Sequence, residues 1–335
     1  MKKLLKLSFT LLMASSLFAC ASTNNTNENS TEKTEVSSSD TKSTEQVTEQ
    51  VTEQEITISH SKGEATVKTN PKKVVVFDMG TLDTINKLGV DAEFALPLNN
   101  VPSYLKGYEN ATNAGGIKEP DLETIYTFAP DVIFISGRQE DFYDELNKIA
   151  PTIYVDLDYK KYMEDLKTNV TNIGKIFNKE DLALEEYNKL ETKVNDAKEK
   201  TKNIEDKALV ILTNGGKLSA YGSGSRFGFI HDVLGFKQAD ENMYKEGEKP
   251  STHGNEASFE YISQINPDIL FVVNRDAVVG GDGNASSTMN NDLVNSTNAA
   301  KNNKIIMLDP EVWYIAGGGL ESVNIMIDET MSALN

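Results

Sequence analysis

The sequence contains few of the residues that build disulfides, cysteine metal clusters and basic surfaces. It has one cysteine, Cys20, so no disulfide can form within the chain and no cysteine-based metal cluster is possible. Only three of its 33 basic residues are arginines, and 51 acidic residues give a net charge of −18. Nucleic acid is not expected as a partner, because binding by counterion release needs a basic face. With 335 residues, of which 39% are hydrophobic, the chain is long enough for about two globular domains.

Residues 1–20 have the features of a bacterial export signal. Lysines precede an apolar stretch from Leu7 to Phe18, which is too short to span a bilayer. The stretch leads into Leu17-Phe18-Ala19-Cys20, which resembles the lipobox of bacterial lipoproteins, whose cysteine becomes the lipidated first residue of the mature protein. We expect Cys20 to be lipidated, and an ordinary cleaved signal with an incidental cysteine is the alternative.

Residues 21–55 consist almost entirely of Ser, Thr, Asn, Glu and Gln, and they include a short repeat between Glu45 and Gln54. Such a composition cannot bury a hydrophobic core. We therefore expect a disordered tether with an end-to-end distance of about 30 to 35 Å, followed by a globular body.

The body contains one sequence pattern twice. After a predicted hairpin from Ile56 to Val67, residues 121–138 align without gaps on residues 258–275, at a constant offset of 137. In each copy a capped helix ends before Pro-Asp, a buried strand follows, and an arginine ends that strand. The repeat predicts an α/β protein with two Rossmann-like lobes, in residues 56–178 and 204–335.

Residues 179–203 lie between these lobes and predict one long helix. They contain neither Gly nor Pro, and their apolar residues share one face. A helix of this length extends for roughly 35 Å, enough to join two lobes as a stiff connection. A helix inside one domain is the alternative, but the position between two similar halves favours the connecting role. The apolar positions are Ala183, Tyr187, Leu190, Val194 and Ala197.

All three arginines lie where an open α/β sheet places its ligand. Arg138 and Arg275 end the equivalent strands, and Arg226 lies in a glycine-rich loop that begins at Tyr221. Converging guanidinium groups suit a polyanion, because they offer forked donors to oxygen and flat faces to aromatic rings. The alternative is that each arginine pairs with an acidic residue. The shared placement of all three favours a ligand site.

Two other residues have side chains that can reach a metal. His253 lies next to a glycine in a polar loop, and Tyr314 follows a predicted strand. We expect His60 to be solvated and His231 to be a packed or surface residue of a helical segment. The three histidines are too scattered for a zinc or manganese site. The sequence has no phosphate-binding loop and no nucleophile elbow, and an enzyme is therefore not expected.

Four segments of the body resemble the ferric siderophore-binding lipoproteins of ABC importers, in the branch that binds ferric catecholates. The resemblance covers the body from about residue 56. It implies a class III substrate-binding protein, with two lobes joined by one long α-helix, that captures a ferric siderophore and holds no permanent cofactor. It also implies a monomer, lipid-anchored at the extracytoplasmic face of the bacterial cell membrane, whose partner is a two-fold ABC permease with its ATPase. The segments are residues 225–232, 253–262, 266–275 and 313–322.

The resemblance also implies roles for individual residues. A linear bis-catecholate supplies four of the six iron ligands, and a phenolate and a neutral imidazole would complete the set. A phenol ionises at neutral pH when a cation as strong as Fe(III) stabilises the anion. The residues that we expect to ligate the iron are His253 and Tyr314. Those that we expect to contact the siderophore are Arg138, Arg226, Arg275, Tyr221 and Trp313.

Glu123 and Glu260 occupy the same place in the two repeats, near the start of a helix. The resemblance implies that they dock onto arginines of the permease, whereas stabilisation of the positive helix end is the alternative. Within the same importer class, a hydroxamate siderophore, haem or cobalamin is the alternative ligand. A surface adhesin or structural lipoprotein is a remote alternative function for the whole chain.

Overall fold

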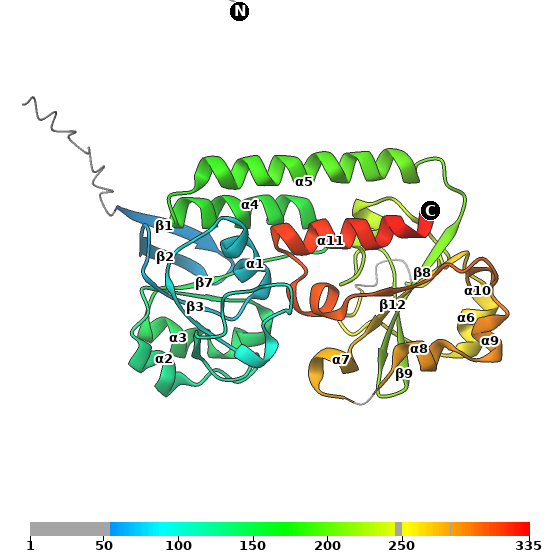
Figure 1. Cartoon of the computed structure of the whole chain (residues 1–335), viewed down its shortest axis with the longest axis horizontal. Coiled ribbons are helices and arrows are strands. Elements are labelled where there is room, and N and C mark those ends of the chain that lie inside the picture. Colours follow the sequence, from blue (N-terminus) through cyan, green and yellow to red (C-terminus); the bar gives the residue numbers. More distant parts are fainter. Residues whose placement is uncertain (1–53, 245–249, 282) are drawn as a thin grey trace, which may run out of the picture. The chain divides into compact units, whose positions relative to one another are not determined.

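The computed structural model describes residues 54–244, 250–281 and 283–335. The predicted export signal, Cys20 and the predicted tether up to residue 53 lie outside these ranges. Within them, the body forms two lobes, each built around one sheet (Figure 1). No helix in these ranges is both long enough and apolar enough to cross a bilayer.

The N-terminal lobe contains a parallel sheet in the strand order β5-β4-β3-β6-β7. Its central strands are runs of valine, isoleucine and phenylalanine with no exposed residue, as in a sheet covered on both faces. The strands are β3 (Lys73–Val76), β4 (Glu93–Leu96), β5 (Thr112–Asn113), β6 (Val132–Ile135) and β7 (Thr152–Tyr154). The helices are α1 (Met79–Lys87), η1 (Leu98–Asn100), α2 (Leu122–Phe128), η2 (Gly137–Phe142), α3 (Tyr143–Ile149) and α4 (Tyr162–Ile176).

An antiparallel hairpin precedes this sheet, as the alternation of apolar and polar residues predicts. It consists of β1 (Glu55–His60) and β2 (Gly63–Lys68). Its inward-facing residues Ile58, Ala65 and Val67 are buried, and both strands lie against β7.

The sheet of the C-terminal lobe is mixed rather than wholly parallel. Its strand order is β11-β9-β8-β12-β13, with the short strand β10 also paired to β8. β8, β12 and β13 are parallel, whereas β9 runs antiparallel to β8 and β11 antiparallel to β9. The β8–β9 hairpin turns at Gly215 and Gly216, whose φ angles of 57° and 77° glycine adopts without steric cost. The repeat therefore predicts the parallel centre of this sheet but not its antiparallel edge.

The elements of the C-terminal lobe follow in chain order. The strands are β8 (Lys207–Asn214), β9 (Lys217–Tyr221), β10 (Lys237–Gln238), β11 (Asn255–Ala257), β12 (Ile269–Asn274) and β13 (Ile305–Leu308). The helical segments are η3 (Phe229–Val233), α6 (Phe259–Ile265), α7 (Asp276–Val279), α8 (Ala285–Met289), α9 (Asp292–Asn295), α10 (Asn298–Lys301), η4 (Glu311–Ala316), α11 (Leu320–Met331) and η5 (Ser332–Leu334).

The aspartate of the repeated Pro-Asp pair has the same structural role in both lobes. Asp131 Oδ2 accepts hydrogen bonds from the backbone amides of Lys72 and Lys73, at 2.8 and 2.9 Å, where β3 begins. Asp268 Oδ2 accepts from the amide of Lys207, at 3.0 Å, where β8 begins. In each lobe, the aspartate that precedes one central strand, β6 or β12, therefore bonds to the backbone at the start of the adjacent strand, β3 or β8.

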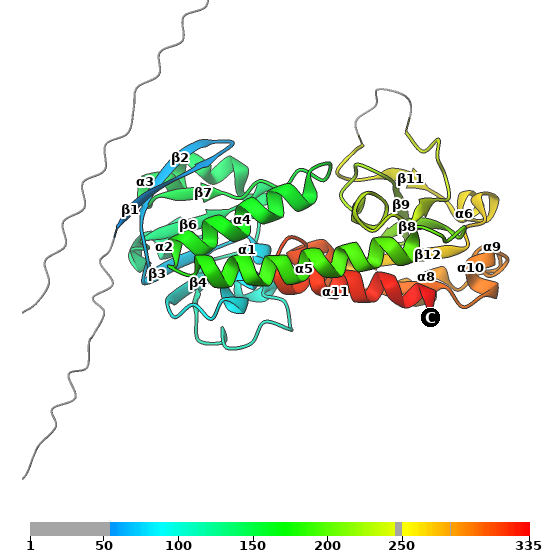
Figure 2. The same cartoon turned by 90° about the horizontal axis from the view of Figure 1, so that it is seen from above.

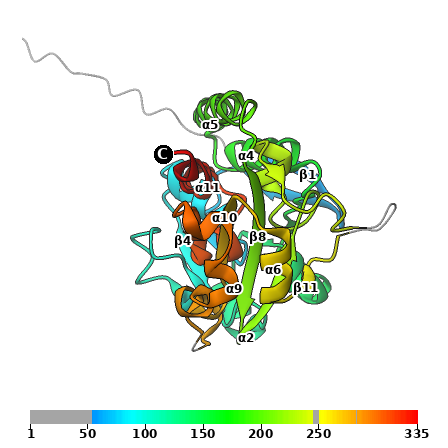
Figure 3. The same ribbon diagram turned by 90° about the vertical axis from the view of Figure 1, so that its right-hand side faces the viewer.

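α5 (Glu180–Thr201) is the long helix that residues 179–203 predict. Its 22 residues extend for roughly 33 Å, and all five expected apolar positions are buried. α11 lies beside α5 and also packs against α1 (Figures 1 and 2). In Figure 3, α4, α5 and α11 lie near one another in the upper part of the view. The connection between the lobes is therefore broader than the single helix that the sequence predicts.

Candidate functional site

Tyr314 lies where arginines from both lobes meet. It belongs to η4, the π-helical segment between β13 and α11. Arg138, just after β6, and Arg226, in the glycine-rich loop after β9, each donate a hydrogen bond from Nη2 to the carbonyl oxygen of Tyr314, the second at 2.6 Å. Arg275, just after β12, donates from Nε to Tyr314 Oη at 2.8 Å. The structure thus brings together four of the residues that the sequence predicts.

The guanidinium groups also surround the ring of Tyr314. The Cζ atom of Arg226 lies 4.0 Å from the ring centroid, and those of Arg275 and Arg138 lie at 5.5 and 5.7 Å. Cations at these distances are attracted to the ring. Backbone, hydroxyl and ring of Tyr314 therefore all contact arginine.

Among the residues that the structure describes, no carboxylate forms an ion pair with this cluster. Within the described residues, the ion pairs to carboxylates come from lysines, while Arg275 Nη1 donates to Asn214 Oδ1 at 2.6 Å. Burial lowers the pKa of Arg138, the charge of Arg226 lowers it further, and Asp78 only partly offsets both. Burial and a neighbouring like charge both disfavour the charged form. The cluster is therefore suited to an anionic ligand, and the described part of the chain gives no support to the alternative of arginine–carboxylate pairs.

The arginines also change the ionisation of Tyr314. Burial raises the pKa of the phenol, but the hydrogen bond from Arg275 and the charges of Arg226, Arg275 and Arg138 outweigh it, so the pKa is below its ordinary value of 10.0. Nearby positive charge favours the phenolate. A phenolate is the form of tyrosine that ligates ferric iron.

Trp313 and Tyr221 lie behind this cluster, not at its surface. Their exposed fractions are 3% and 2%. Trp313 Nε1 donates to Glu329 Oε2 at 2.7 Å, and its ring packs against two phenylalanines. Burial raises the pKa of Tyr221 to about 12. Both side chains belong to the core beside Tyr314 and Arg226, and their direct contact with a ligand stays a prediction.

His253 lies on an exposed turn. Its backbone amide donates to Ser251 Oγ at 3.1 Å, and the amide of Gly254 donates to the carbonyl oxygen of Ser251 at 3.0 Å. Gly254 has a φ of +72°, and a Cβ atom there would lie 2.8 Å from Cζ of Tyr221, so this turn needs glycine. Among the described residues no contact joins His253 to Tyr314, and its role as an iron ligand stays a prediction.

The other two histidines differ in their environment. His231 has an exposed fraction of 9%, and its Nδ1 lies 2.9 Å from the carbonyl oxygen of Phe236, so it is the packed one of the two expected alternatives. His60 is half-buried: its ring lies edge-on to Tyr143 at 5.8 Å, and burial lowers its pKa. His60 is therefore more buried than the solvated surface position that the sequence predicts. No cluster of three or more His, Cys, Asp or Glu side chains that could hold a metal ion occurs in the described ranges.

Glu123 and Glu260 lie in the first turns of α2 and α6, and both are exposed. The residues before these helices have equivalent roles, since Asp121 and Ser258 each accept from the amide three positions later, at 3.0 and 3.2 Å. Bonds from its own backbone amide and from Ser258 lower the pKa of Glu260. The first turns of α2 and α6 therefore have the same local structure. The docking of Glu123 and Glu260 onto a permease stays a prediction.

Two polar residues that contact the site or its supporting elements are not predicted from the sequence. Asn214, which accepts from Arg275, is the last residue of β8, so its position at a strand end is the signal that could have found it. Asp83 lies inside α1, where its spacing gives no such signal.

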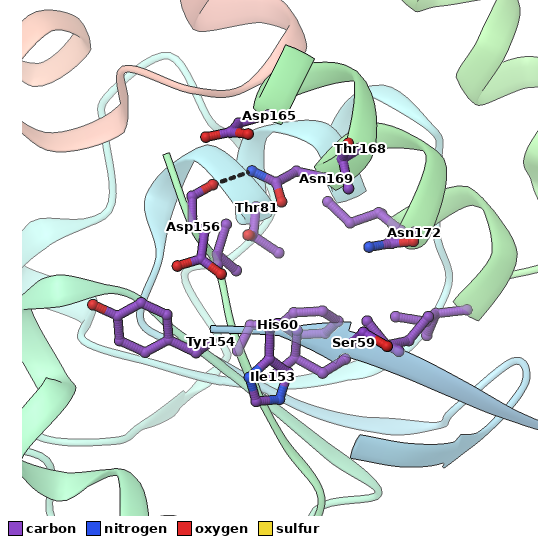
Figure 4. Close-up of a pocket in the computed structure, with 15 residues that line it drawn as sticks. Ser59, His60, Thr81, Ile153, Tyr154, Asp156, Asp165, Thr168, Asn169 and Asn172 are labelled. Atoms are coloured by element: carbon purple, nitrogen blue, oxygen red, sulfur yellow. Dashed lines mark hydrogen bonds between the residues drawn. The ribbon is translucent and has the colours of Figure 1, made fainter. Parts of the chain in front are cut away.

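A separate cavity of about 150 Å³ lies in the N-terminal lobe, between the β1–β2 hairpin, β7 and α4 (Figure 4). Asp156, Asp165 and Asn169 are among its polar lining residues, and Asn169 Nδ2 donates to the carbonyl oxygen of Asp156 at 2.8 Å. None of the three arginines lines it. This cavity is therefore not part of the site around Tyr314.

Residues 74–312 match the model of the periplasmic binding protein family, which is more than half of the chain. The chain belongs to this family. Among its relatives is the petrobactin-binding protein YclQ of Bacillus subtilis, 44% identical over 286 residues that cover 84% of this chain and 89% of YclQ. The ferric-anguibactin-binding protein FatB of Vibrio anguillarum is 34% identical over 282 residues, covering 82% of this chain and 86% of FatB.

Solved structures of the family share the fold. The crystal structure of YclQ matches with a TM-score of 0.80 and 43% identity, over 84% of this chain and 99% of YclQ. That of the catecholate-siderophore binding protein VctP from Vibrio cholerae matches with a TM-score of 0.76 and 34% identity, over 83% and 100%. The class III substrate-binding fold, with two α/β lobes joined by a long helix, is confirmed. By their names these relatives are binding proteins.

Proposed function

We propose that this periplasmic binding protein captures a ferric siderophore of the catecholate type between its lobes and delivers it to an ABC permease for iron uptake. The observation that carries the proposal is the convergence of Arg138, Arg226 and Arg275, drawn from both lobes and without carboxylate partners in the described residues, on Tyr314. The names of YclQ, FatB and VctP, which refer to petrobactin, ferric anguibactin and a catecholate siderophore, support this ligand class.

The chemistry of the cluster fits a ferric bis-catecholate. Such a complex is anionic, and its catecholate oxygens accept charge-assisted hydrogen bonds from guanidinium groups. Each guanidinium has five N–H donors, so Arg138 and Arg226 keep free donors besides those directed at the Tyr314 carbonyl. The phenolate of Tyr314 takes a fifth iron position, and His253, carried inward by its turn, takes the sixth.

The same electrostatics rank the candidate ligands. A neutral ferric tris-hydroxamate needs no excess of positive charge, whereas burial and Arg226 already disfavour the charge of Arg138. A bound anionic complex would favour the charged form of Arg138, so we retain the catecholate class in preference to hydroxamate or cobalamin.

A titration of the full chain tests the ligand class. Trp313 is the only tryptophan and adjoins Tyr314, so its fluorescence reports on a light-absorbing ligand bound there. We expect quenching at low concentration by ferric bis- and tris-catecholates, and weak or no quenching by a ferric tris-hydroxamate, haem or cobalamin. Preferential binding of any of the last three would overturn the proposal.

The proposal includes a lipid anchor at Cys20 on the extracytoplasmic face of the membrane. Diacylglycerol together with an N-acyl chain holds a protein at a membrane stably, which one chain does not. Cys20→Ser should therefore move the protein from the membrane fraction to the soluble one and abolish labelling by a fatty acid. Continued membrane retention and labelling would show that Cys20 is not the anchor.

A further inference from the structure

A carboxylate of the N-terminal lobe holds the start of α11. Asp83, on α1, has an exposed fraction of 0%. Its Oδ1 accepts from the backbone amide of Glu321 at 2.9 Å, and its Oδ2 accepts from the amide of Ser322 at 2.6 Å and from the hydroxyl of Tyr104 at 2.9 Å. Amides in the first turn of a helix have no partner within that helix, so this side chain satisfies two of them across the lobes.

The backbone next to these bonds is packed against α1 with no room for side chains. A Cβ atom on Gly80 would lie 2.9 Å from the carbonyl carbon of Gly318, and one on Gly319 would lie 2.5 Å from Cγ of Asp83. Real Cβ atoms do not approach this closely, so Gly80 and Gly319 allow α1 to touch the Gly317–Gly319 segment directly.

Ser322 connects this contact to η4. Its amide donates to Asp83, while its hydroxyl accepts from the amide of Gly319 at 2.9 Å and donates to the carbonyl oxygen of Ala316 at 2.7 Å. Ala316 is the last residue of η4, two positions after Tyr314. A continuous chain of hydrogen bonds therefore runs from α1 to the segment that carries Tyr314.

We propose that Asp83 is a positioning residue for Tyr314: by fixing α11 and the glycine segment against α1, it sets where the phenol stands among the arginines. Tyr314 would ligate iron, so this inference rests on the proposed function. Arg138 also links the N-terminal lobe to Tyr314 through a hydrogen bond, but its guanidinium is one of the groups that we expect to bind the ligand. The hydrogen-bond partners of Asp83 are the amides of Glu321 and Ser322 and the hydroxyl of Tyr104, none of which belongs to the arginine cluster.

The pKa of Asp83 is consistent with a carboxylate whose role is to position α11. Burial raises the pKa of Asp83 to about 6, although the amides of Glu321 and Ser322 and the hydroxyls of Ser322 and Tyr104 lower it. A buried carboxylate is costly to ionise, and here the donors aimed at it, together with the positive end of α11, offset part of that cost.

The first test uses hydrogen exchange and needs no ligand. In Asp83→Asn the amide group cannot accept at both of its atoms, so the amides of Glu321 and Ser322 should not both stay bonded. We expect faster exchange in residues 311–322 of the full chain. Ile327→Val, in the same helix and fully buried, is the control for a general loss of stability and should leave that exchange unchanged. Lys87→Gln removes an exposed ion pair between α1 and α11, in which Lys87 Nζ lies 2.9 Å from Glu321 Oε2. This variant is the control for the loss of some other contact between the two helices.

The second test measures coupling to Tyr314, with the ferric complexes of a linear bis-catecholate and of a hexadentate tris-catecholate as probes. Misplacement of a reacting group by about 1 Å can cost about a hundredfold. We expect Asp83→Asn to weaken the bis-catecholate about ten- to a hundredfold and the tris-catecholate far less. In a Tyr314→Phe background, Asp83→Asn should cause no further loss. Gly80→Ala, which displaces the same contact, should behave alike if Asp83→Asn does not fold.

The outcomes separate this inference from the proposed function. Unchanged exchange in residues 311–322, or a loss of affinity that is the same with and without the Tyr314 hydroxyl, would overturn the positioning role. If the wild type binds neither ferric catecholate, the proposed ligand is wrong, and the exchange experiment alone then decides whether Asp83 holds η4.

Discussion

Arg138 and Arg226, one from each lobe, donate hydrogen bonds to the same atom, the carbonyl oxygen of Tyr314. A main-chain atom thereby holds two like-charged side chains close together. Because the arginines are already oriented, less conformational freedom is lost when an anion binds between them.

The first prediction concerns the arginines. Replacing Arg138, Arg226 or Arg275 by Gln should weaken both bis- and tris-catecholate complexes, because each loses a charged donor. A hydrogen bond to a charged group contributes about 1.5 to 3 kcal/mol, or roughly ten- to a hundredfold in affinity. Fluorescence titration measures the loss, and Lys202→Gln, at the exposed residue that follows α5, is the matched control. Unchanged affinity in all three variants would assign the arginines a structural role.

The second prediction separates coordination from charge. Tyr314→Phe and His253→Ala should weaken tetradentate ligands far more than hexadentate ones, since the latter already fill all six iron positions. Tyr314→Phe should also remove the phenolate charge-transfer band from the absorption spectrum. Equal losses for both ligand types would show that neither side chain ligates iron.

The sequence pattern predicts the parts of the site that depend on local structure. Each repeat encodes a capped helix, a buried strand and an arginine, and parallel strands present their carboxyl ends at one sheet edge, so the convergence of Arg138 and Arg275 could be anticipated. The antiparallel edge formed by β9 and β11 was missed, because it depends on the turn at Gly215 and Gly216.

Other features depend on contacts between residues distant in the chain. Asp83 lies in an amphipathic helix pattern, and its partner Glu321 is 238 positions later, so no local signal marks it as buried. Trp313 and Tyr314 are neighbours in the sequence, but successive side chains of a helical segment point in different directions. The first therefore packs in the core while the second meets the arginines.

The third prediction concerns motion. α5 and α11 both span the junction of the lobes, so we expect the lobes to shift only slightly on binding, with the turn that carries His253 doing most of the closing. Solution scattering should show a nearly unchanged radius of gyration, and hydrogen exchange should show new protection in residues 250–255. A large compaction with ligand would contradict a rigid connection.

The fourth prediction follows from the pKa of Asp83, which burial raises from 3.8 to about 6. Between these values the folded protein binds more protons than the unfolded one, so this group contributes more to the free energy of unfolding as the pH falls from 7 to 4. The shift corresponds to about 3 kcal/mol. Asparagine does not titrate, so the stability of the wild type relative to Asp83→Asn should increase over this range.

Urea denaturation of both proteins at several pH values measures that difference. Glu329, whose pKa burial also raises, is present in both chains and cancels in the comparison. A difference in free energy of unfolding that is the same at pH 4 and pH 7 would show that Asp83 titrates at its ordinary value.

The last prediction concerns delivery to the permease. Glu123 and Glu260 lie at matched positions on α2 and α6. Both are exposed, and each is the second residue of a helix that has an N-cap side chain. A permease with two-fold symmetry would need one such glutamate from each lobe. Stabilisation of the helix N-terminus, by contrast, does not require that either glutamate is accessible to a partner. We therefore expect Glu123→Arg or Glu260→Arg to abolish siderophore-dependent growth while ligand affinity and melting temperature stay nearly unchanged. Glu199→Arg makes the same charge change on α5, away from both helices, and should grow normally. If affinity falls together with uptake, the two glutamates belong to the binding site or the fold, and the docking role is wrong.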